Sequence, residues 1–267
     1  MIGARQGGKG IHMDNKRQRA VFLDLDGTIA NHNRPPSETV TAAIRRARAA
    51  GHRVFLCTGR APAYIYDAVR EVGFDGIVAA AGGYIRLGGE VLYRRFLSGE
   101  LLRTVIGAYL ENGKAVLLEG EVNMYAVNTP PYHKKEWPSV TGPEDFAAGG
   151  RFAGQGVYKF TAYGALGEER RVLEPAMNLI CHDTYVEALP AGVNKADGMR
   201  RVLERIGVPQ ADSIAVGDSR NDIDMLLYAG TGVAMGGSPA EVVQAADRVT
   251  GTLEENGAAG DLEELLA

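Results

Sequence analysis

The chain has 267 residues, which is enough for one large domain or two domains of ordinary size. Hydrophobic residues make up 45% of it and charged residues 23%, a balance typical of globular proteins and not of disordered ones. The formal net charge of -4 argues against a basic surface for nucleic acid. No apolar run reaches the ~18 residues of a membrane-spanning helix, so neither nucleic acid nor a membrane is an expected partner.

Cysteine content and the N-terminus indicate the compartment. Two cysteines, Cys57 and Cys181, cannot build a disulfide framework, which favours a reducing environment. Residues 1–18 are basic and rich in glycine, and they lack the apolar stretch of a secretory signal. We therefore expect a cytoplasmic protein whose first 18 residues form a flexible leader without a chemical role.

Residues 19–84 alternate between strand and helix patterns. The apolar run at 20–25 is typical of a strand buried on both faces of a parallel sheet. Ser37 is a suitable N-cap for the helix that follows, and Gly51 is a suitable end for it. This order of elements predicts right-handed parallel crossovers. The expected strands lie at 20–25, 54–57 and 76–80, and the expected helices at 37–51 and 62–73.

The pattern changes after residue 83. Hairpin signals, short strands and a loop rich in proline, glycine and charge at 128–150 replace the regular alternation. Hairpins mixed with helices are typical of an α+β insert and not of a continuing parallel sheet. The expected elements are a hairpin at 86–96, a helix at 98–112, and strands at 115–118, 122–127, 157–162, 178–181 and 185–189.

The regular alternation resumes at Lys195, which begins a helix with one apolar face. The elements expected after it are a strand at 213–216, a helix at 221–229, a strand at 232–235 and a helix at 239–246. The predicted fold class is therefore α/β, with a doubly wound, mainly parallel, Rossmann-like core and an inserted α+β cap domain. The predicted ranges are 19–84 and 189–267 for the core and 85–188 for the cap.

Polar and acidic residues follow the predicted core strands at the point where each strand ends. Ligand sites of open α/β sheets lie beyond these carboxyl ends. If the sheet forms as predicted, the following residues converge on one crevice: Asp24, Asp26, Thr58, Gly59, Arg60, Lys195, Asp218, Asn221 and Asp222. Crowded carboxylates repel one another unless a cation joins them, and oxygen ligands without a Cys or His cluster favour Mg²⁺ over zinc.

A phosphate ester suits such a crevice. Lys195, Thr58 and backbone N–H groups can hold phosphate oxygens, and one carboxylate can attack phosphorus to give an aspartyl-phosphate. Asp24 and Asp26 are two residues apart, and Gly27 permits a sharp turn after them. Both carboxylates can thus leave the strand end toward the crevice, where the second can protonate a leaving oxygen and later deprotonate water.

Five segments in order carry a resemblance to a known family. They read DLDGT at 24–28, CTGR at 57–60, NKADGM at 194–199, GDSRNDIDM at 217–225 and GVAMG at 232–236. With these segments the chain resembles the haloacid dehalogenase-like (HAD) phosphatase superfamily, and specifically its Cof-type branch with a late-inserted (C2-type) cap. The short interval between Asp24 and Thr58 and the long one between Arg60 and Lys195 match that branch.

The resemblance implies a role for each matching residue. Asp24 would be the nucleophile and Asp26 the general acid/base. The resemblance also implies Mg²⁺ held by Asp24, the Asp26 carbonyl and Asp218, with Asp222 as a ligand or a neighbour of the ligands. The phosphate of a small-molecule ester would be held by Thr58, Gly59, Lys195 and Asn221. Two departures stand out: Ala81-Gly82-Gly83 replaces a common Asn-Gly pair, and Lys-Ala-Asp-Gly replaces the commoner Lys-Gly.

Several readings stay open. Taken alone, Asp26-Gly27 is a frequent turn pair, and Asp218 and Asp222 are acids that favour a helix N-terminus. Roles for Arg60 and Ser219 are undecided, and the insert residues Tyr84, Glu119 and Tyr125 fit core or surface positions better than a substrate site. A phosphomutase or a non-catalytic phosphate-binding module could use the same core, and the chain could be a monomer or a homodimer.

Overall fold

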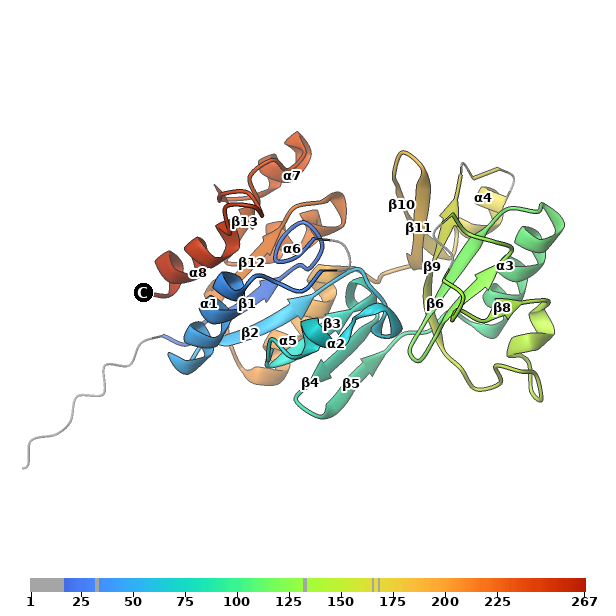
Figure 1. Ribbon diagram of the computed structural model, residues 1–267, viewed down its shortest axis with the longest axis horizontal. Helices are drawn as coiled ribbons and strands as arrows, with labels where there is room; N and C mark the ends of the chain where they lie inside the picture. The colour runs from blue at the N-terminus through green and yellow to red at the C-terminus, as the bar shows by residue number, and fades with distance from the viewer. Residues whose placement is uncertain (1–16, 32–33, 132–133, 165, 168) are drawn as a thin grey trace, which may run out of the picture.

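The computed structural model describes residues 17–31, 34–131, 134–164, 166–167 and 169–267. Two β-sheets organise it: a sheet of eight strands and a sheet of six, which lie at opposite ends of the molecule in Figure 1. The predicted leader lies outside the described residues up to residue 16. Among the described residues, no helix has the length and apolar character needed to cross a lipid bilayer.

The eight-stranded sheet is parallel through six of its strands. Its order is β14 (Arg248–Val249), β13 (Thr231–Ala234), β12 (Ser213–Gly217), β1 (Ala20–Leu23), β2 (Arg53–Cys57), β3 (Gly76–Ala79), β4 (Tyr84–Leu87) and β5 (Glu90–Arg94). In the parallel register Leu23 lies opposite Leu56 on one side and Val216 on the other. The three central strands therefore end at the same edge, so the residues that follow them are brought together.

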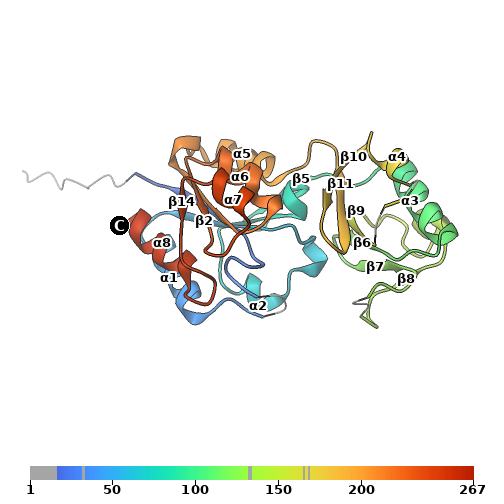
Figure 2. The ribbon, with the colours of Figure 1, turned by 90° about the horizontal axis from the view of Figure 1, so that it is seen from above.

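Helices cover both faces of this sheet, as the view in Figure 2 makes clear. Because strand residues alternate, Val21 and Leu23 pack with one set of helices while Phe22 packs with the other. The first set is α1 (Glu38–Ala49), α2 (Asp67–Arg70) and α8 (Gly257–Leu266), and the second is α5 (Lys195–Ile206), α6 (Ile223–Tyr228) and α7 (Ala240–Ala245). We call this sheet and its helices the core.

The six-stranded sheet forms the cap together with two helices. Its order is β10 (Met177–Cys181), β11 (Tyr185–Pro190), β9 (Val157–Tyr163), β6 (Val116–Gly120), β7 (Met124–Val127) and β8 (Ser139–Val140). The helices α3 (Gly99–Glu111) and α4 (Glu169–Leu173) lie on the side away from the core (Figure 1). The face that α3 leaves open is turned toward the carboxyl edge of the core sheet. The α/β fold with an inserted α+β cap matches the prediction.

The predicted helix at 62–73 is wrong in its middle. The chain forms a 3-10 turn at Pro62–Tyr64 and the short helix α2, and Ile65 between them has an extended backbone. Where the helix is interrupted, arginine side chains donate hydrogen bonds to the backbone carbonyl oxygens. Arg70 donates to the carbonyls of Pro62 and Ile65, and Arg60 donates to that of Tyr64. The helical pattern of the sequence at 62–73 does not show that these side chains will replace the hydrogen bonds of a continuous helix.

The predicted hairpin exists, but it belongs to the other sheet. Strand β4 pairs with β3, so β4 and β5 extend the core sheet in the antiparallel sense instead of forming part of the cap. Ile85 on β4 is fully buried in the cluster beneath α5. The predicted boundary at residue 85 therefore falls inside a core strand, while the other limits of the predicted domains stay predictions. The sequence reading also missed α4, α8, β8 and β14.

Candidate active site

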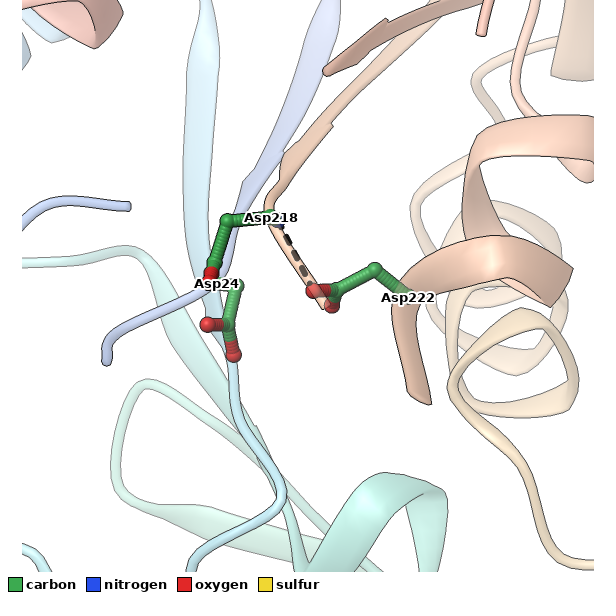
Figure 3. Close-up of side chains that lie close together, drawn as sticks. All are labelled: Asp24, Asp218 and Asp222. Atoms are coloured by element: carbon green, nitrogen blue, oxygen red, sulfur yellow. Dashed lines mark hydrogen bonds between the residues drawn. The ribbon is translucent and has the colours of Figure 1, made fainter. Parts of the chain in front are cut away.

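Three carboxylates meet where β1 and β12 end. Asp24 directly follows the buried run of β1, and Asp218 directly follows β12, whose neighbour is β1. Asp222 comes from the 3-10 turn that opens α6. One oxygen of each lies within 4.8 Å of an oxygen of both others, and Figure 3 shows the Asp218 carboxylate directed toward Asp24 with Asp222 beside them.

Lys195 lies against two of these carboxylates. Its Nζ is 2.6 Å from Asp24 Oδ1 and 2.5 Å from Asp222 Oδ1, and its side chain is fully buried. Lys195 occupies the first position of α5, where the Asn194 side chain caps the helix by accepting from Asp197 N–H. Burial alone would lower the pKa of this ammonium, but the attraction of Asp222 and Asp24 outweighs it and raises the pKa.

Negative charge exceeds positive charge in this cluster. Burial raises the pKa of Asp24 well above its ordinary value despite Lys195, and Asp222 and Asp218 add to that effect. Burial and the repulsion of Asp222 likewise raise the pKa of Asp218 to about 6. A divalent cation among the carboxylates would remove this repulsion, and a donor set of oxygens alone is the kind that Mg²⁺ prefers. The residues therefore fit a divalent metal.

Asp222 is buried beneath the other two carboxylates, and its oxygens are occupied by protein groups. Its side chain is fully buried, and its Oδ2 accepts from the N–H groups of Asp218 and Ser219 at 3.0 and 2.9 Å. The first of these bonds is the dashed line in Figure 3. With Lys195 on its other oxygen, Asp222 holds the loop that carries Asp218 in place.

Gly27 permits the close approach of two loops. Its φ is +88°, and a Cβ at this position would lie 2.3 Å from Asp218 Oδ2. The turn after β1 can therefore pass directly over Asp218, where Thr28 Oγ1 donates to Asp218 Oδ1 at 2.9 Å. This bond favours the charged form of Asp218 and opposes the effect of burial.

A cavity of about 270 Å³ opens above the carboxylates, between core and cap. The predicted site residues that line it are Asp24, Asp26, Thr58, Gly59, Asp218 and Asn221. Gly59 leaves room here, because a Cβ on it would lie 3.1 Å from Asn221 Nδ2. Lys195 and Asp222 lie behind Asp24 and do not line the cavity. The predicted residues therefore lie close together, six of them at the cavity surface and Lys195 and Asp222 in a buried layer beneath it.

Arg60, whose role the sequence left open, pairs with Asp26. Its Nε and a terminal nitrogen lie 2.6 and 2.7 Å from the two carboxylate oxygens. The guanidinium also lies over the rings of Tyr64 and Tyr66, at 4.6 and 5.3 Å from their centroids. Asp26 is therefore held at the rim of the cavity by a group that itself has fixed neighbours.

The cap contributes six residues to the cavity wall, namely Glu119, Lys159, Thr161, His182, Tyr185 and Glu187. The sequence had favoured a core or surface role for Glu119 and a solvated or packing role for His182, and it did not single out the other four. A usable signal was present, because Lys159 and Glu187 are the charged residues of strands that are otherwise uncharged and mostly apolar. Tyr84 and Tyr125 pack against other aromatic rings of the structure.

Comparison with known proteins identifies the class. A profile of the haloacid dehalogenase-like hydrolase family matches residues 21–262, which include both core segments and the insert, and the chain belongs to this family. The Bacillus subtilis protein YkrA is 28% identical over 263 residues, covering 95% of this chain and 98% of YkrA. A phosphoglycolate phosphatase of Methanosarcina acetivorans is 28% identical, with 92% and 95% covered.

Similarity to solved structures indicates the branch of the family. The structure of the HAD subclass IIB sugar phosphatase BT4131 superposes with a TM-score of 0.79 at 25% identity, covering 93% of this chain and 99% of that one. Family, relatives and fold together make this chain a phosphatase of the Cof-type branch.

Proposed function

We propose that this phosphatase hydrolyses a small phosphorylated metabolite, a sugar phosphate or a phosphorylated cofactor, through an aspartyl-phosphate on Asp24. The observation that carries the proposal is the position of Asp24. It lies at the tip of a buried strand, 4% exposed, with an ammonium at 2.6 Å and a small cavity above it. The relatives are named for small phosphate esters, phosphoglycolate in one case and sugars in the other. The two free cysteines fit a cytoplasmic setting.

The metal in this proposal is Mg²⁺. Asp24, Asp218 and the backbone carbonyl of Asp26 would hold it, and Asp222 would support them from behind. Bound there, Mg²⁺ would offset the charge of the carboxylates and of the phosphate oxygens.

The residues then divide the reaction between them. Thr58, Gly59 and Asn221 would hold the phosphate oxygens so that phosphorus faces a carboxylate oxygen of Asp24, and Lys195 would offset negative charge from behind Asp24. As the new oxygen–phosphorus bond forms, the bond to the leaving oxygen breaks, and Asp26 gives that oxygen a proton. Asp26 then removes a proton from water, which attacks phosphorus and restores the Asp24 carboxylate while inorganic phosphate leaves.

The pairing of Arg60 with Asp26 adds a condition to this sequence. Both oxygens of Asp26 accept from Arg60 in the structure described here. To contact a leaving oxygen, the carboxyl group must therefore turn away from Arg60. Because the guanidinium has its own contacts with Tyr64 and Tyr66, Asp26 is the partner that moves.

The test is phosphate release from a broad set of phosphate esters with Mg²⁺ and with EDTA. We expect Mg²⁺-dependent release that Asp24→Asn reduces at least about 1,000-fold, because the nucleophile is lost. Asp224→Asn is the matched control, since Asp224 lies exposed on α6 of the same segment. Brief reaction with a ³²P-labelled ester should leave label on Asp24 in the wild-type protein.

Other outcomes would select other functions. If a hexose 1-phosphate is converted to its isomer without free phosphate, the chain is a mutase. If no ester is hydrolysed with Mg²⁺, a non-catalytic phosphate-binding module remains. Full activity of the Asp24→Asn protein would discard the covalent mechanism.

A further inference from the structure

Four cap residues form a charged cluster directly opposite the candidate phosphate site. They are Glu119 on β6, Lys159 and Thr161 on β9, and Glu187 on β11, and we call them the cap cluster. Lys159 and Glu119 are 3% and 4% exposed, so the burial of these charges costs free energy that their partners must offset. The cap cluster lines the same cavity as Asp24.

The ammonium of Lys159 is fully engaged. Its Nζ lies 2.5 Å from Glu187 Oε2, 3.5 Å from Glu119 Oε1 and 3.2 Å from the Gly59 carbonyl oxygen. An ammonium has three donors, and three acceptors surround this one. Lys159 is thus committed to its neighbours and does not offer a free positive charge to a substrate.

The two carboxylates, in contrast, keep acceptor capacity. Each carboxylate oxygen can accept two hydrogen bonds. Glu119 Oε1 accepts from Thr161 at 2.7 Å and lies 3.5 Å from Lys159 Nζ. Glu187 accepts from Lys159 through Oε2, and its Oε1 lies 3.4 Å from His182 Nε2. Two carboxylates share one ammonium, so the cap cluster as a whole is acceptor-rich and carries excess negative charge. Burial and the repulsion of Glu187 raise the pKa of Glu119. Burial would also raise the pKa of Glu187, but Lys159 and His182 outweigh it and lower this pKa to about 2.

The cluster also lies where a leaving group must be. The contact between Lys159 and the Gly59 carbonyl joins it directly to the loop after β2. Tyr185, stacked on His182 with 4.2 Å between ring centroids, and Tyr64 of the core add flat walls beside it. The part of an ester beyond its phosphate therefore contacts carboxylates and aromatic rings.

We propose that the cap cluster is a charge filter: Glu119 and Glu187 accept esters whose leaving group is uncharged and bears hydroxyl groups, and they reject leaving groups that carry a carboxylate. The inference rests on the proposed function and names its substrate class. A substrate hydroxyl group can donate to either carboxylate or to the hydroxyl oxygen of Thr161, whereas a second anion meets like charge at short range. The chain therefore differs in substrate from its relative named for phosphoglycolate.

The experiment compares esters that differ in one group. Glucose 6-phosphate, glucosamine 6-phosphate and 6-phosphogluconate present a hydroxyl, an ammonium and a carboxylate on similar carbon chains. Phenyl phosphate and 4-carboxyphenyl phosphate form an aryl pair for which leaving-group chemistry is easy. We expect kcat/KM to be at least about tenfold higher for the uncharged member than for the carboxylate member of each series.

Two variants then test the residues. Glu119→Gln and Glu187→Gln each leave Lys159 with one carboxylate partner, so the fold should tolerate both. Each should reduce the discrimination against the carboxylate ester several-fold, mostly through KM. Glu174→Gln is the matched control, since it removes a carboxylate from an exposed pair on the outer side of the cap, and it should leave the discrimination unchanged.

The outcomes separate the two proposals. Absence of Mg²⁺-dependent release from every ester defeats the proposed function. Hydrolysis without discrimination against carboxylates, or discrimination that survives both Gln variants, defeats the filter alone. Faster hydrolysis of 6-phosphogluconate than of glucosamine 6-phosphate also overturns it, because like charge would then not be rejected.

Discussion

At the scale of single residues, Gly27 shows how a missing side chain can serve the site. Gly27→Ala would place a methyl group on Asp218 and force a β-carbon into a left-handed backbone conformation. We expect a loss of at least about 100-fold in kcat, since small displacements of reacting groups have effects of this size. Gly51→Ala is the control, because Gly51 also has a positive φ but no atom within 4 Å of the new Cβ. Equal activities of the two variants would contradict this role.

The sequence predicted best those site residues that directly follow a strand of the parallel sheet. Asp24, Thr58 and Asp218 could be expected side by side, because neighbouring parallel strands end at one edge. The partner of Arg60 could not be read from the chain, since Asp26 and Arg60 meet only once the β1 and β2 loops have folded. The buried charges of the cap were visible in the strands, but their convergence depends on the pairing of β6, β9 and β11.

At the scale of elements, Asp75 connects a helix to a strand. It accepts from Arg48 in the last turn of α1 and from the N–H of Val54 in β2, both at 2.9 Å. Burial would raise the pKa of Asp75, but these hydrogen bonds outweigh it and lower the pKa below its ordinary value of 3.8. The bonds therefore add stability above about pH 4, and this stability is lost as the pH falls through the lower, folded-state pKa.

The corresponding measurement is urea unfolding of wild-type and Asp75→Asn protein between pH 3 and 7. We expect the variant to be less stable by about 1–3 kcal/mol at pH 7, and the difference to shrink steadily below pH 4. Glu174→Gln, which removes a carboxylate exposed to solvent, should show little difference at any pH. A gap between wild type and Asp75→Asn that does not depend on pH would rule out the proposed linkage.

Elements were easier to predict than their partners. The N-cap Ser37 is a local signal, and α1 begins where it predicts; α3 likewise begins directly after Ser98, within the predicted interval 98–112. The interval from Pro62 to Arg70 also has helical signals, but arginine side chains stabilise its broken form. The hairpin of β4 and β5 is likewise a local feature, whereas the sheet that it joins is decided by its pairing with β3.

At the scale of the whole molecule, the acidic cluster links stability to pH and metal. Folding raises the pKa of Asp218 from its ordinary 3.8 to about 6, so the folded protein without metal binds a proton more tightly than the unfolded chain. Its stability should therefore fall as the pH rises through this interval. At 100 times its Kd, Mg²⁺ should restore about 2.7 kcal/mol at pH 7 and less at pH 4.

Unfolding with EDTA and with Mg²⁺ at both pH values measures this linkage. Asp218→Asn should be more stable than wild type in EDTA at pH 7 and should gain little from Mg²⁺. Asp224→Asn, which changes an exposed acid of α6, should behave as wild type. A full stabilisation of the Asp218→Asn protein by Mg²⁺ would exclude this carboxylate as a ligand.

The size of the cavity between core and cap limits which phosphate esters can reach Asp24. With about 270 Å³ of space, it is smaller than the ~300–1,000 Å³ pockets that hold drug-sized ligands. A phosphoserine on the surface of a folded protein would have to enter this cavity to bring its phosphorus to Asp24. We therefore expect the phosphatase to favour small free esters over phosphorylated proteins.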